Sequence, residues 1–124
     1  MKKIGIIRCE KNEERCPLTN CLKCLVETRE GFQMYDQATP AGVFTCRCPG
    51  DGVADLARIL KAKGADALHF CTCTFARKGD DGWTMADGGF CAHIDEMIAK
   101  VTAAVDIPVV KGTAHLPKGY NPRS

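Results

Sequence analysis

The most informative chemical feature of this sequence is its nine cysteines among 124 residues. Six of them stand at the ends of apolar runs or at the start of a helical segment, and one histidine accompanies them; the set comprises Cys9, Cys46, Cys48, Cys71, Cys73, Cys91 and His93. Thiolates and imidazoles bind zinc, and a thiolate is also the nucleophile of thiol-dependent enzymes. The residue types therefore predict a metal site or a reactive thiol.

A disulfide scaffold is a poor explanation for these cysteines. An odd number cannot pair fully within one chain. The basic start Met1–Lys3 is followed by only four residues, Ile4–Ile7, before Arg8 interrupts, whereas a secretory signal needs an apolar run of roughly 7–15 residues. We therefore expect a cytoplasmic protein, in a compartment where lasting disulfides are rare and cysteines serve as thiols or ligands.

Composition narrows the possible partners. The net charge is +2 with both signs interleaved, so the chain has no electrostatic footprint for nucleic acid. No run approaches the ~18 apolar residues of a membrane span. With 45% hydrophobic and 26% charged residues, the sequence predicts one folded domain over residues 1–124. The partner that its cysteines predict is a metal ion. Nothing in the sequence identifies a protein partner.

The elements that must position the cysteines follow from the hydrophobic pattern. Apolar runs predict strands at 3–9, 41–46, 67–73 and 107–112, and helical periodicity appears over 18–32, 51–64 and 91–104. This alternation predicts an α/β fold: a three-layer domain with a mainly parallel sheet of about four strands, Rossmann-like or flavodoxin-like. The glycine-rich segment 76–89, with the only tryptophan, is predicted to be a loop that covers a site, and residues 113–124 an irregular tail.

The carboxyl ends of parallel strands lie at one edge of a sheet, and such folds bind ligands there. We therefore predict that the residues at this edge approach each other and bind a metal ion. The predicted ligands are Cys9, Cys46, Cys48, Cys73, Cys91 and His93. Zinc is favoured because the set includes an imidazole, and an iron–sulfur cluster is the alternative if only thiolates bind.

A thiol-based redox or transfer enzyme is the competing function. Cys48 precedes Pro49 at the predicted start of a helix, where the helix dipole lowers a thiol pKa, and Cys46 would be its resolving partner. Cys71 and Cys73 would point to the same face if both stay in the strand. In a third possibility the cysteines are structural and the domain binds another protein.

Position along the chain predicts the roles of the other cysteines and histidines. Cys16 and Cys21 join the cluster if they hold the start of the first helix near the edge of the sheet, whereas Cys24 is predicted to fill space in the core. His69, inside a strand, is predicted to be a core histidine bonded to the backbone. For His115, which follows the last strand, a structural role and a role in the site are equally compatible with the sequence.

An ordered series of motifs along the chain resembles the CGGC-domain family, a group of small bacterial and archaeal proteins that is mostly uncharacterised. The matching segments are 4–9, 16–17, Cys21, 45–50, 64–66, 69–70, Cys73, 91–93 and 108–113. The resemblance covers roughly residues 2 to 115, and it implies metal binding, zinc in particular.

The sequence departs from the family pattern at the central motif, where Arg47 alone stands between Cys46 and Cys48 in place of two glycines. A Cys-x-Cys pair presents its sulfurs differently from a pair with a two-glycine spacer, so it either bridges two ions or turns one sulfur inward. Cys71 looks like an addition to the family pattern, and the loop before Cys91 is longer than usual.

Overall fold

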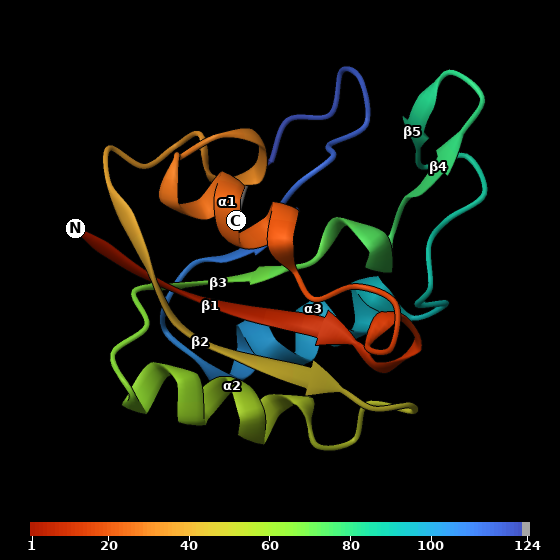
Figure 1. Ribbon diagram of the computed structural model, residues 1–124. Helices are drawn as coiled ribbons and strands as arrows, with labels where there is room; N and C mark the ends of the chain where they lie inside the picture. The colour runs from red at the N-terminus through yellow and green to blue at the C-terminus, as the bar shows by residue number, and fades with distance from the viewer. Residues whose placement is uncertain (123–124) are drawn as a thin grey trace.

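A parallel four-stranded sheet with the order β2-β1-β3-β6 forms the centre of the computed structural model, which describes residues 1–122 (Figure 1). Its strands are β1 (Lys2–Cys9), β2 (Ala38–Cys46), β3 (Ala67–Phe70) and β6 (Val109–Lys111). This order is that of the first four strands of the flavodoxin-like doubly wound sheet. The predicted α/β fold with a parallel sheet of about four strands is confirmed.

Helices cover both faces of the sheet. Helix α1 (Thr19–Val26) lies on one face, and α2 (Val53–Ala62) and α3 (Ile94–Ala104) lie together on the other (Figure 1). Three short 3-10 helices, η1 (Glu10–Asn12), η2 (Glu30–Phe32) and η3 (Thr72–Thr74), and a hairpin of β4 (Arg77–Gly79) and β5 (Gly82–Thr84) complete the elements within residues 1–122. Helix α3 has 11 residues and is the longest of those described, whereas ~20 are needed to cross a bilayer.

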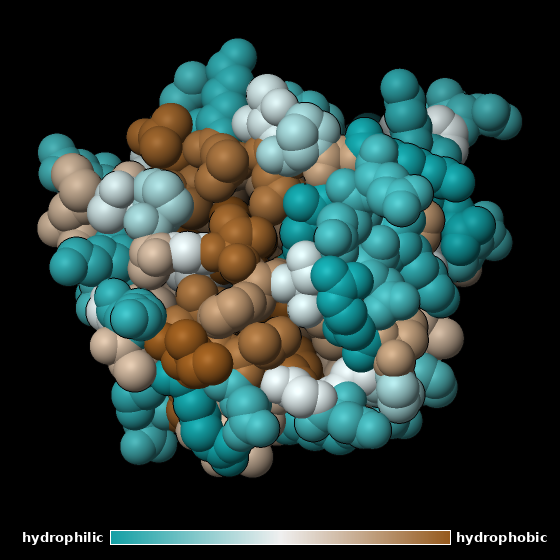
Figure 2. Space-filling model, turned by 60° about the horizontal axis from the view of Figure 1, so that its bottom comes forward, coloured by the Kyte–Doolittle hydropathy of each residue, from teal (hydrophilic) through white to brown (hydrophobic). Residues whose placement is uncertain are grey.

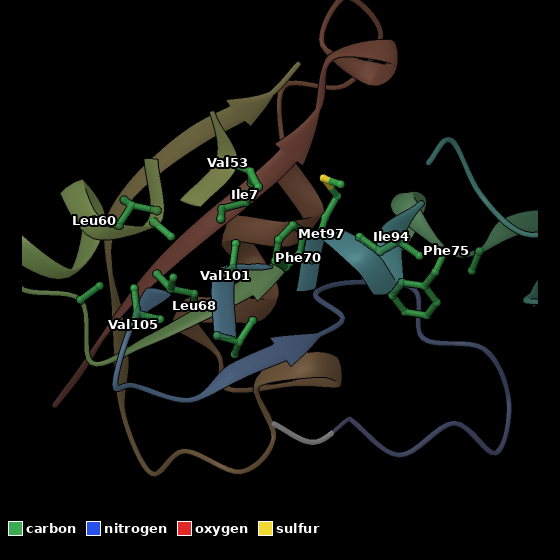
Figure 3. Packing of buried hydrophobic residues seen from close by; sticks show 14 residues of the cluster. Ile7, Val53, Leu60, Leu68, Phe70, Phe75, Ile94, Met97, Val101 and Val105 are labelled. Carbon is green, nitrogen blue, oxygen red and sulfur yellow. The ribbon is translucent and has the colours of Figure 1, made fainter. Parts of the chain in front are cut away.

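The core explains why β1 is a continuous apolar run. Ile6 packs into the cluster under α1. The next residue, Ile7, packs into the cluster under α2 and α3, which Figure 3 shows. Both are fully buried, and each such side chain contributes about 1.5–3 kcal/mol. In α2 the buried positions Val53, Ala57 and Leu60 follow helical spacing, as the sequence predicts.

On the outside of the same layer, some apolar side chains remain exposed. Figure 2 turns the side that carries α2 toward the viewer and shows a hydrophobic area among polar residues. Ile59 of α2 is among the exposed apolar side chains, at 44%.

The third strand is shorter than predicted, because it ends at Phe70 rather than at Cys73. Beyond Phe70 the chain turns into η3, where the amide and hydroxyl of Thr74 both donate to the carbonyl of Cys71. Threonine side chains compete with the sheet for backbone groups in this way. Cys71 and Cys73 therefore lie beyond the strand and not on it as predicted, although their sulfurs do lie side by side.

The first helix also ends early, at Val26 instead of residue 32. Thr28 and Glu30 adopt positive φ angles, and Gly31 donates its amide to the carbonyl of Thr113 at 2.7 Å. Only glycine fits there, since a Cβ on Gly31 would lie 2.5 Å from the carbonyl oxygen of Gly112. This close approach to the segment after β6 turns the chain out of the helix.

Other boundaries differ by a few residues. Helices predicted to begin at residues 51 and 91 begin at Val53 and Ile94, and the predicted loop 76–89 contains the β4–β5 hairpin. The described part of the predicted irregular tail, 113–122, contains no helix or strand, although Thr113 and Ala114 are buried. Residues 123 and 124 of that tail lie outside the described residues.

Candidate functional site

The structure separates seven of the cysteines into two groups at the carboxyl edge of the sheet, which meet where the charge of Cys73 acts on Cys9. Cys46 and Cys91 pack against the hydrophobic cluster under α2 and α3, whereas Cys21, Cys71 and Cys73 belong to the side that α1 covers. We call Cys9, Cys46, Cys48 and Cys91 the edge thiols, and Cys21, Cys71 and Cys73 the cavity thiols. The single site predicted from the sequence is therefore two groups of thiols.

The edge thiols gather where β1 and β2 end. Cys9 and Cys46 are direct partners in the parallel ladder, and adjacent strands lie about 4.8 Å apart. Burial raises the pKa of the Cys46 thiol to about 11, and the charges of Cys91, Cys9 and Cys48 raise it further. Burial likewise raises the pKa of Cys9 although a hydrogen bond from the Lys11 backbone opposes it, and the charges of Cys48, Cys91 and Cys73 add to the rise. These thiols are thus close enough to repel each other when ionised.

Cys48 does not lie at the start of a helix, which corrects the sequence-based prediction. Residues 49–52 form a turn in which Gly50 donates to Arg47, and α2 begins only at Val53. The Cys48 thiol is exposed, and its backbone amide donates to a Glu10 carboxylate oxygen at 2.8 Å. The helix dipole that was expected to activate Cys48 is therefore displaced from it.

The remaining two predicted ligands lie differently. Cys73 is in η3, where its Sγ accepts a hydrogen bond of 3.4 Å from the amide of Asn12, and it lines a cavity with Cys71. His93 is the exposed residue before α3. Within residues 1–122, no three or more Cys, His, Asp or Glu side chains are already arranged to hold a metal ion.

A cavity of about 470 Å³ lies beside the cavity thiols. It opens where the chain leaves β1 and β3, the point at which the doubly wound order changes direction. Its walls come from the segment after β1, from α1, from η3, from the hairpin with the segment that follows it, and from the chain after β6. The lining includes Asn12, Cys16, Cys21, Cys71, Cys73, Arg77, Lys78, Trp83, Thr113 and His115.

Cys21 receives several hydrogen bonds at one sulfur. Its Sγ lies 3.1 Å from Oγ1 of Thr113, and Oγ1 in turn accepts the amide of Thr72 at 3.2 Å. Either atom of this pair can be the donor, and when Cys21 is a thiolate the Thr113 hydroxyl must donate, because a thiolate only accepts. Hydrogen bonds from Cys71, Thr113 and the backbone of Ala114, with the charge of Arg8, lower the pKa of Cys21 to about 6 although burial opposes them.

Cys71 supplies the shared proton of this group. Its thiol is 1% exposed and hydrogen bonds to both Cys21 and Cys73, and these bonds, with burial, hold its pKa well above the usual value. The hydrogen bond from Cys71, assisted by Asn12, lowers the pKa of Cys73. Because the Cys71 thiol has a single proton, it donates to one neighbouring sulfur at a time, and this environment lowers the pKa of both Cys21 and Cys73.

An aromatic pair stands at the cavity wall. The rings of Trp83 on β5 and His115 are stacked, with centroids 5.0 Å apart and planes 3° from parallel. The side-chain amide of Asn20 lies 3.1 Å from Nε2 of His115, and because an amide NH₂ can only donate, Nε2 is the acceptor. The segment that was predicted to cover a site thus helps to enclose the cavity, and His115 belongs to its lining.

Two assignments made from the sequence are confirmed outside the site. Cys24 is 6% exposed and packs in the core under α1. His69 is fully buried, and its Nδ1 donates to the carbonyl of Gly112 at 2.8 Å.

Cys21 and Thr113 are the residues whose importance the sequence-based set missed. The predicted ligands do not include Cys21, because its position on the first crossover helix does not determine which way it faces. The signal for Thr113 was its position just after the fourth strand, at the same edge of the sheet as the other ends.

Comparison with known proteins agrees with the motif series. No match to the chain was found among curated proteins or among solved structures. The family model of the CGGC domain matches residues 3–114. This range includes the sheet, the edge thiols and the cavity thiols. The chain therefore belongs to the CGGC domain family.

Proposed function

We propose that the edge thiols bind a zinc ion, with Cys9, Cys46, Cys48 and Cys91 as the ligands. The observation that carries this proposal is the direct pairing of Cys9 with Cys46 at the carboxyl edge of the sheet, beside the charges of Cys48 and Cys91. Four thiolates in a tetrahedral arrangement are a common set of ligands for structural zinc.

The chemistry of these donors fits a cation. Burial and mutual repulsion keep Cys9 and Cys46 protonated at neutral pH, and a divalent cation among them would reverse the sign of that interaction and displace the protons. The guanidinium of Arg47 faces outward to Glu13, at 3.1 Å, so it leaves the space between the sulfurs to the metal.

Metal binding requires the chain to rearrange, because within residues 1–122 no three of these side chains are already arranged to hold an ion. The sulfur of Cys48 is exposed, whereas Cys9 is buried, so the turn at residues 47–52 must bring it inward to complete four ligands. Cys73 is left to the cavity, where Asn12 already donates to it. His93, at the same edge, is the ligand available if Cys48 stays outside.

Metal content tests the proposal directly. Full-length protein purified anaerobically is expected to be colourless and to carry about one zinc per chain. Inductively coupled plasma mass spectrometry measures the zinc content. The Cys9→Ser and Cys46→Ser variants are expected to lose the zinc, whereas Cys24→Ala and Cys73→Ser keep it. A brown protein would indicate that the same thiols bind an iron–sulfur cluster instead of zinc. Zinc that survives in Cys46→Ser at full occupancy would refute the assignment.

A further inference from the structure

The cavity thiols lie at the place where doubly wound sheets bind their ligands, and they are separate from the proposed zinc ligands. The order β2-β1-β3-β6 changes direction between β1 and β3, and residues that follow these two strands, Asn12, Cys16 and Cys73 among them, line the cavity. Its volume of about 470 Å³ is within the usual range for small-molecule sites. The fold thus offers a ligand space with sulfurs in its wall.

The charges around the cavity favour an anionic ligand. Arg77 and Lys78 line it, and no carboxylate does so among the described residues. The guanidinium of Arg8 donates to the carbonyls of Asn12 and Cys16, its charge acts on Cys21, and its Nε is buried without a hydrogen-bond partner in residues 1–122. The ring of Trp83 supplies an apolar surface at the same wall.

The three sulfurs have distinct environments. Cys21 is surrounded by hydrogen-bond donors, namely the Thr113 hydroxyl, the Ala114 amide and the Cys71 thiol. Cys71 is a buried protonated thiol in contact with Cys21. A stabilised thiolate beside a second thiol is the arrangement that thiol–disulfide exchange requires.

We propose that the cavity is a thiol–disulfide exchange site for an anionic low-molecular-weight disulfide, in which Cys21 is the nucleophile and Cys71 the resolving thiol. The proposal stands on the cavity, its cationic lining and the contact between the two cysteines. It does not depend on zinc at the edge thiols.

The reaction has two balanced steps. The Cys21 thiolate attacks one sulfur of the bound disulfide, an S–S bond forms between them, the original S–S bond breaks, and one substrate thiolate departs. Cys71 then attacks the sulfur of Cys21, giving a Cys21–Cys71 disulfide, and the Cys71 proton leaves with the second substrate thiol. The substrate disulfide is reduced by two electrons, and the two cysteines are oxidised.

Thr113 is a positioning residue in this scheme. Its hydroxyl is held by the amide of Thr72 and donates to Cys21 when that sulfur is a thiolate. Serine at this position keeps the hydroxyl, whereas valine has nearly the same shape and removes it. The pair Thr113→Ser and Thr113→Val therefore separates the hydrogen bond from packing.

The expected rate has a characteristic pH dependence. A thiol with a pKa of about 6 in place of 9.0 has about 500 times more thiolate at pH 6, but each thiolate is about 20-fold less nucleophilic for a Brønsted coefficient of about 0.45. Cys21 is thus expected to react about 20-fold faster than an ordinary peptide thiol at pH 6. At pH 9 the same arithmetic makes it about tenfold slower.

The test uses the full chain, reduced, with glutathione disulfide as the anionic probe and cystamine as a cationic control. At pH 6 the wild-type protein is expected to react faster with glutathione disulfide than with cystamine, and peptide mass spectrometry should locate a Cys21–Cys71 disulfide without an adduct. Cys71→Ser should stop at a glutathione adduct on Cys21. Cys21→Ser should lose the fast phase, while Cys24→Ala, on the same helix, should retain it.

The Thr113 pair provides the second measurement. Thr113→Val is expected to move the midpoint of the pH–rate profile upward, and Thr113→Ser to stay close to the wild type. The proposal is overturned if the fast phase persists in Cys21→Ser, if the first adduct forms on Cys48, or if cystamine reacts as fast as glutathione disulfide at pH 6. Repeating the assay on Cys46→Ser keeps this result separate from the zinc proposal, because that variant is expected to exchange normally.

Discussion

The hydroxyl of Tyr35 lies 2.7 Å from Nε2 of His69, at the centre of the layer that α1 covers. The other ring nitrogen, Nδ1, faces the carbonyl of Gly112 at 2.8 Å and must carry the proton, since a carbonyl only accepts. Nε2 is therefore an acceptor, and Tyr35 is the donor. The pair fixes the tautomer of a fully buried histidine.

Removing the Tyr35 hydroxyl is expected to destabilise the fold. Tyr35→Phe leaves Nε2 of His69 buried without a donor, which costs about 1–3 kcal/mol in the free energy of unfolding. Urea denaturation at pH 7 measures the change. In the control Tyr120→Phe, the lost bond is to the carbonyl of Lys111 at a half-buried site, where water can replace it, so the cost should be smaller. Equal stability of Tyr35→Phe and the wild type would contradict the assigned tautomer.

His69 also predicts a loss of stability in acid. Burial lowers its pKa to about 4 from 6.5, so the unfolded chain takes up this proton before the folded chain does. The associated stability is fully present above pH 6.5 and disappears as the pH falls toward 4. Its size is on the order of 3 kcal/mol. His69→Gln does not titrate, and its unfolding free energy should fall less steeply over this window.

Gly31 is expected to tolerate no side chain. In Gly31→Ala the new Cβ would meet backbone atoms of Gly112 and Thr113 at 2.5–2.7 Å, and it would push away the segment that bonds Cys21. We expect a loss of about 2 kcal/mol or more in the free energy of unfolding. Gly52→Ala is the matched control, because nothing lies within 4 Å of its Cβ position. A thermal scan in which both variants melt together would argue against the close approach.

Opening the aromatic wall should expose Cys21 to large reagents. The stack of Trp83 on His115 is worth about 0.5–1.5 kcal/mol, so Trp83→Ala should raise the open fraction of the cavity by up to about tenfold. Alkylation of Cys21 by a bulky maleimide, followed by peptide mass spectrometry, reports this fraction. Met85→Ala changes an exposed side chain of the same segment and should leave the alkylation rate unaltered.

The sequence predicted the sheet well because its strands are buried on both faces. The run Ile4–Ile7 needs no alternation, since successive residues enter different hydrophobic clusters. The convergence of Cys9 with Cys46 followed from parallel topology alone. These features depend on local composition and on one rule of connectivity.

The two-part division of the cysteines could not be predicted in the same way. It depends on where β3 ends, which the local hydrogen bonds of Thr74 decide, and on which face of the sheet α1 covers. The environment of Cys21 is built by Thr113, 92 residues away along the chain. Neither the direction of a helix face nor a hydroxyl contact of that range leaves a periodic signal in the sequence.

The separation of the thiols into two groups has a consequence for control. A disulfide between Cys21 and Cys71 consumes no edge thiol, and a metal ion on Cys9 and Cys46 consumes no cavity thiol. If both proposals hold, thiol oxidation and metal occupancy use different cysteines of one small chain and give it four combinations of state. The charge of Cys73, which acts on Cys9, is the point at which one state would influence the other.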